Sequence, residues 1–193
     1  MALDWRELVH VYVELGKEST TDTFLPAWAL REKARQGELP EEAIPLIVAC
    51  LALAADHVTI THLAKALAVF GRRAGLASSL IIEKLRGMHV DDDTSFWSLD
   101  GCLHALGHLG GEVVGEFLDE LAARSPNPVT RAGSVYQGEI PAADREKLFS
   151  ETLTRVRGLL AQPEIEGWRS KRTKRQPKRV DARKKMSPWM TRK

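Results

Sequence analysis

Two histidines four residues apart can bring their imidazoles to one face of a helix. His104 and His108 have the spacing with which histidine pairs bind zinc in catalytic helices, but a zinc site needs at least one further protein ligand. Glu112 follows at the same interval, yet Gly110 and Gly111 come first and are expected to end the helix. We therefore interpret the pair as partly buried or surface histidines near a helix end. We expect no metal, no cofactor and no catalytic residue, and a metal-dependent enzyme is the least favoured hypothesis.

Four aspartates, Asp91, Asp92, Asp93 and Asp100, lie close together and can attract a cation. Their spacing lacks the glycine at the sixth position and the glutamate at the twelfth that an EF-hand loop requires. An acidic loop that caps the start of a helix is the better interpretation, because acidic groups interact favourably with the positive end of the helix dipole.

Arg72 and Arg73 lie in a predicted turn between two helices. They can bind a phosphate or an acidic partner there. They can equally neutralise the carbonyl groups at the C-terminus of a helix.

The strongest concentration of charge lies at the C-terminus. Residues 168–193 contain 12 Lys and Arg against one Asp, whereas residues 1–167 contain 16 Lys and Arg against 25 Asp and Glu, so the overall charge of +2 combines +11 with −9. Lys and Arg neutralise phosphates with release of counterions, and a tryptophan can stack on an exposed base, so RNA or DNA is a candidate partner. The tail residues predicted to bind a partner are Trp168, Arg169, Lys171, Arg172, Lys174, Arg175 and Trp189.

Other interpretations of this tail remain open. It can be a solubilising segment, it can fold back on the acidic part of the same or a neighbouring molecule, or residues 186–190 (MSPWM) can anchor a short peptide that orders on a partner. An anionic membrane surface is less supported, because the apolar residues form no amphipathic stripe. By composition alone, residues 162–193 are predicted to be disordered.

An internal repeat organises the rest of the chain. The sequence CLHALGHLGGEVVGEFLDEL at 102–121 matches ALAVFGRRAGLASSLIIEKL at 66–85, 36 residues earlier, with Gly107 opposite Gly71. A two-helix unit cannot bury its apolar face alone, so a period of 34 to 36 residues predicts a short α-solenoid, an all-α fold without sheet. We expect a repeat domain at 1–161, with units near 26–55, 61–87 and 94–124, a degenerate unit at 128–161, and a tail at 162–193.

About nine helices follow from the apolar periodicity and the stop signals. Gly37, Gly71 and Gly107 are each expected to close an outer helix, and Val113 to belong to a buried stripe. Pro45 requires that its helix begin nearer Glu42 or bend. The predicted helices span residues 4–15, 26–36, 41–55, 61–70, 76–86, 94–109, 112–123, 129–137 and 141–160.

The compartment is inferred from three features. The first ten residues are charged where a secretory signal needs an apolar run, and the longest apolar run, 43–55, is too short to span a bilayer. Cys50 and Cys102 lie on predicted core faces without CxxC spacing, which favours reduced thiols. We therefore expect a cytoplasmic protein.

The segments ALGHLGGEVVGEFLDEL and LAVFGRRAGLASSLIIEKL resemble HEAT-like repeats of the kind named after phycobilisome lyases, over about residues 26–123. The resemblance implies an α-solenoid surface that holds another protein or a nucleic acid. The His-Glu dipeptides of the HEAT-like deoxyhypusine hydroxylases are absent, nothing identifies a bilin pocket, and the acidic repeat region does not match the basic face of HEAT-like DNA glycosylases. We expect a non-catalytic adaptor or scaffold that binds a protein partner, with the tail as a second contact; the alternative is nucleic-acid association through the tail.

Overall fold

The computed structural model describes residues 4–18, 23–124 and 136–162. These residues form eight α-helices and one 3-10 helix and contain no strand, so the predicted all-α class is confirmed for this part of the chain. The elements are α1 (Trp5–Glu18), α2 (Phe24–Gln36), α3 (Ala43–Leu53), α4 (His57–Ala68), η1 (Gly71–Ala77), α5 (Ser78–Arg86), α6 (Asp93–Leu109), α7 (Glu112–Ala123) and α9 (Ala142–Leu160).

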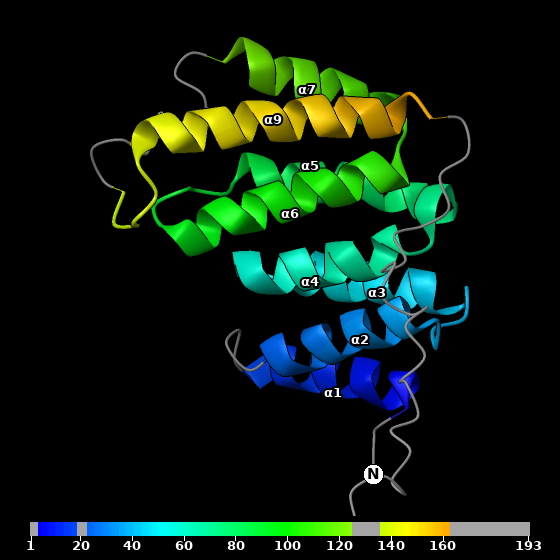
Figure 1. Cartoon of the computed structure of the whole chain (residues 1–193). Coiled ribbons are helices and arrows are strands. Elements are labelled where there is room, and N and C mark those ends of the chain that lie inside the picture. The colour runs from blue at the N-terminus through cyan, green and yellow to red at the C-terminus, as the bar shows by residue number, and fades with distance from the viewer. Residues whose placement is uncertain (1–3, 19–22, 125–135, 163–193) are drawn as a thin grey trace, which may run out of the picture.

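The helices pack in two layers (Figure 1). One layer contains α2, α4, α6 and α9 in this order, each packed against the next, and the other contains α1, α3, α5 and α7. Across the layers, α1 packs on α2, α3 on α4, α5 on α6 and α7 on α9, which gives four tiers. The apolar core lies between the layers and is richest along α4 and α6, most of whose residues are buried.

Several helix ends follow from the sequence signals. Gly37 ends α2 in the left-handed conformation with φ 78°, as predicted. The Asp92 carboxylate accepts a hydrogen bond from the Ser95 backbone N–H at 2.6 Å, and the Ser95 hydroxyl completes a capping box, so the acidic cluster does begin a helix. Helix α3 begins at Ala43, which places Pro45 in the first turn, where a missing N–H is tolerated.

Helix α6 approaches both of its neighbours closely because two of its positions lack a side chain. A Cβ atom on Gly101 would lie 2.9 Å from Cγ2 of Thr61 on α4, and one on Gly107 would lie 2.9 Å from Cδ1 of Leu159 on α9. The expectation that Gly107 closes an outer helix is therefore wrong: α6 continues to Leu109 and ends at Gly110. Gly107 serves the contact between helices instead.

Two further expectations concern the second half of the chain. Val113 is 43% exposed and does not belong to the buried stripe of α7. The residues that form this stripe are Val114, Phe117, Leu118 and Leu121. Of the predicted helix at 129–137, residues 129–135 lie outside the described part, and residues 136–137 are not helical.

Each of the first three predicted repeat units contains one helix from each layer.

Both cysteines, Cys50 and Cys102, are free and buried. Among the described helices, none combines the length and apolar character that a bilayer crossing requires.

Gly110 gives a sharp test of this packing. Its φ of 69° and ψ of −162° fall in a region that other residues rarely adopt, and a Cβ atom there would occupy the place of the Arg72 guanidinium. We expect Gly110→Ala to lower the free energy of unfolding by about 2 kcal/mol or more.

The matched control is Gly115→Ala in α7, where a Cβ atom meets nothing within 4 Å. This change should raise stability by about 0.5 kcal/mol, because alanine loses less backbone entropy in a helix. Urea unfolding followed by circular dichroism measures the free energy of unfolding of both variants. Equal effects of the two substitutions would contradict the conclusion that the backbone at Gly110 and its contact with Arg72 require glycine.

Candidate functional site

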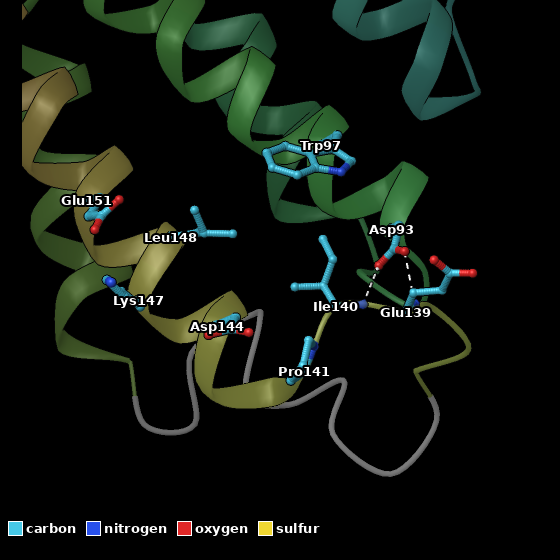
Figure 2. Close-up of a pocket in the computed structure, with 9 residues that line it drawn as sticks. All are labelled: Asp93, Trp97, Glu139, Ile140, Pro141, Asp144, Lys147, Leu148 and Glu151. Carbon is cyan, nitrogen blue, oxygen red and sulfur yellow. Dashed lines mark hydrogen bonds between the residues drawn. The ribbon is translucent and has the colours of Figure 1, made fainter.

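A pocket opens between the N-terminal parts of α6 and α9 (Figure 2). Its volume is about 480 Å³, and residues 139–141, which lead into α9, close one side. The residues that line it are Asp93, Trp97, Glu139, Ile140, Pro141, Asp144, Lys147, Leu148 and Glu151.

The Asp93 carboxylate fixes one edge of the pocket. It accepts hydrogen bonds from the backbone N–H groups of Glu139 at 2.9 Å and Ile140 at 3.2 Å, and from the hydroxyl of Tyr136. These hydrogen bonds, that of Tyr136 first, lower the pKa of Asp93. The segment before α9 is thereby tied to the first turn of α6, and the Gln137 backbone N–H adds a bond of 2.8 Å to the carbonyl oxygen of Asp91.

Arg145 holds the same edge from within α9. It is only 3% exposed, its guanidinium carbon lies 3.6 Å from the centroid of the Tyr136 ring, and its Nη1 donates to the carbonyl oxygen of Ile140 at 2.7 Å. Burial, followed by the hydrogen bond to Asp93, raises the pKa of Tyr136 to about 12, so this hydroxyl keeps its proton. A cation on an aromatic ring and a charge-assisted hydrogen bond thus join α9 to the segment that precedes it.

The walls of the pocket combine an apolar and an acidic part. Trp97 is 50% exposed, and Figure 2 shows Leu148 and Ile140 turned toward the same space. Glu139, Asp144 and Glu151 are exposed on the rim, and none of them forms an ion pair with another described residue.

This combination suits a cationic side chain with an apolar stem. The stem of a lysine or arginine can lie on Trp97 and Leu148, with its charged end near the carboxylates of the rim. One lysine, Lys147, also faces the pocket, so its carboxylates still outnumber its cations by four to one.

The two predicted binding arginines of the described part contact the protein itself. Arg72 donates from Nη2 to the carbonyl oxygen of Leu160, the last residue of α9, at 3.3 Å, and lies against Gly110. Arg73 is exposed, forms an ion pair with Glu41 and donates from Nε to the carbonyl oxygen of Phe70 at 3.3 Å. Both residues therefore bond to carbonyl groups at or just beyond helix ends, the second of the two interpretations given above.

The predicted tail residues Trp168, Arg169, Lys171, Arg172, Lys174, Arg175 and Trp189 lie outside the described residues. None of the pocket residues except Asp93 was singled out from the sequence. One signal was present: Trp97 lies off the apolar face that Phe96, Leu99 and Leu103 bury on α6, so its exposure follows from the helical period.

His104 and His108 do lie together on α6, with ring centroids 5.0 Å apart in an edge-on arrangement. His108 is 8% exposed, and neither ring nitrogen has a hydrogen-bond partner among the described residues. Burial, followed by the charges of His104 and Arg72, lowers the pKa of His108 to about 4. In the described part of the chain, no three His, Cys, Asp or Glu side chains gather in a group able to hold a metal ion.

Comparison of the chain with protein families, curated proteins and solved structures found no match.

The histidine pair predicts how stability depends on pH. The unfolded state binds a proton to His108 near its ordinary pKa of 6.5, whereas the folded state resists it down to about 4, so stability falls as the pH drops between these values. At pH 5 this residue costs about 2 kcal/mol relative to pH 7.5.

His108→Leu should therefore flatten the decline in stability between pH 7.5 and pH 5. It should also raise stability at pH 7.5, because it removes two buried ring nitrogens that lack hydrogen bonds. Urea unfolding at both pH values measures the effect, and a variant whose stability falls as steeply as that of the wild type would refute the role of His108.

Proposed function

We propose that the chain is a non-catalytic HEAT-like repeat protein, a short α-solenoid that acts as an adaptor or scaffold. It binds another protein through its helical surface, and the basic tail provides a second contact. The single observation that carries the proposal is the pocket between α6 and α9, which presents a half-exposed tryptophan beside three carboxylates without ion-pair partners in the described part. A tryptophan in a concave, partly apolar site is the kind of side chain that dominates binding energy in protein interfaces.

The arrangement of helices supports the solenoid part of the proposal. Two layers of four helices stack in successive tiers, and each tier contacts mainly the next one, as in repeat proteins whose units share a core with their neighbours. Gly37 and Gly71, 34 residues apart, both adopt positive φ after a helix of the same layer. The free thiols of Cys50 and Cys102 fit a reducing compartment such as the cytoplasm, where we propose that the protein acts.

The chemistry of the pocket indicates which part of a partner it takes. Because the rim is acidic and the walls are partly apolar, the best-fitting ligand is a protein segment with lysine or arginine near an aliphatic residue. Such binding should weaken with salt, since the rim carboxylates are exposed and therefore screened.

Capture of partners from native cell extract, carried out both with and without nuclease, tests the proposal. Trp97→Ser should release a specifically bound protein partner or lower its affinity by about 30-fold, which corresponds to the loss of about 2 kcal/mol for an aromatic anchor. The matched control is Trp28→Ser on α2, a tryptophan of the same layer that is 46% exposed and lies outside the pocket.

Two outcomes would contradict the proposal. If Trp28→Ser and Trp97→Ser behave alike, the pocket is not the recognition site. If all captured material disappears with nuclease, the competing hypothesis holds and the chain associates with RNA or DNA through its basic tail.

A further inference from the structure

We propose that the first occupant of the pocket is the basic segment 169–175 of this same chain, which folds back along α9 and must be displaced before a partner binds. The inference rests on the proposed function, in which the pocket takes a cationic segment of a protein. It adds the identity of that segment and a form of self-competition.

The connection has the right length. The described chain ends at Gln162, directly after α9, and the pocket lies along the first half of α9, from Pro141 to Glu151. With a rise of 1.5 Å per residue, Glu151 and Asp144 lie about 16 and 27 Å back from Gln162. An extended chain covers about 3.3 Å per residue, so five to eight residues reach these carboxylates. The segment that arrives there begins at about Trp168 and Arg169.

The charges are complementary. The segment 169–175 contains Arg169, Lys171, Arg172, Lys174 and Arg175 with no acidic residue between them. The pocket presents four carboxylates and one lysine.

Carboxylates elsewhere on the described surface are often already paired. Glu38 pairs with Lys33, Glu41 with Arg73, Asp119 with Arg157, and Glu120 with both Arg86 and Arg124. The rim residues Glu139, Asp144 and Glu151 have no such cation within the described part, and they line a single pocket together with Asp93, so they are the better destination for new positive charge.

Because the segment 169–175 is covalently linked to α9, even weak binding is sufficient for it to occupy the pocket. A short connection between two sites gives an effective concentration of about 1 mM. If the isolated segment binds with a dissociation constant of about 0.1 mM, the tethered segment occupies the pocket most of the time and lowers the apparent affinity of any competitor about tenfold.

A labelled peptide of residues 168–179 provides the probe, and fluorescence anisotropy at low salt measures its binding to full-length chains. In the first variant, the five Lys and Arg of residues 169–175 are replaced with Gln. This chain should bind the peptide about tenfold more tightly than the wild type, because its own tail no longer competes. Adding Glu139→Gln, Asp144→Asn and Glu151→Gln to it should abolish binding.

The matched control adds Glu42→Gln, Glu83→Gln and Glu116→Gln to the same tail variant; these exposed acidic residues lie outside the pocket, and their replacement should leave binding unchanged. Equal binding of the peptide by the wild-type and the tail-neutralised chain would overturn the inference while leaving the pocket as a site for cationic segments. Equal loss in the pocket and control variants would overturn it too, since the attraction would then be general. Trp97-dependent capture of a partner decides the proposed function separately.

Zero-length carbodiimide cross-linking of the full chain distinguishes a pocket occupied by the tail of the same molecule from one occupied by the tail of a second copy. We expect Lys171 or Lys174 to be joined to a rim carboxylate within monomers. Cross-links found only in dimers would overturn the inference, because the segment would then come from a second copy.

Discussion

The close approach of α6 to its two neighbours is the constraint on which the rest of the structure depends. Gly101 lets α4 approach on one side, and Gly107 lets α9 approach on the other, in each case more closely than a methyl group would allow. At the contact between α4 and α6, the hydroxyl of Thr61 donates a hydrogen bond to the carbonyl oxygen of Ser98 at 3.2 Å. The same hydroxyl lies 3.4 Å from Sγ of Cys102. The second contact lies near the C-terminal ends of α6 and α9, and the pocket lies between the N-terminal parts of the same two helices.

The sequence predicted the helices well where local chemistry decides them. Apolar periodicity located α7 to the residue, and Gly37 and the aspartates before α6 marked true helix ends. The same reasoning failed at Gly107, because glycine is used both to end a helix and to let another helix approach, and a single sequence does not distinguish the two. The structure shows the second use, because α6 continues to Leu109 and Leu159 of α9 lies against Gly107.

The pocket was beyond prediction for a different reason. Its walls come from residues 93–97 and 139–151, which no repeat period or local signal relates. Asp93 was expected to act at a helix start, yet its carboxylate binds the backbone of a segment 46 and 47 residues further along the chain. The local sequence indicated an acidic cluster at the start of a helix, but it did not indicate which groups bind the Asp93 carboxylate. Those groups are brought to Asp93 by the packing of α6 against α9.

Charged residues are used differently at the candidate site and in the ion pairs of the described surface. Several exposed pairs link neighbouring elements, such as Arg86 with Glu120 and Arg157 with Asp119, and pairs of this kind contribute little to stability. At the pocket, Asp144 and Glu151 are exposed and have no ion-pair partner in the described part of the chain, although both line the same space. Since exposed carboxylates influence specificity and association rate more than stability, the acidic rim around Trp97 supports the proposed recognition of a cationic segment.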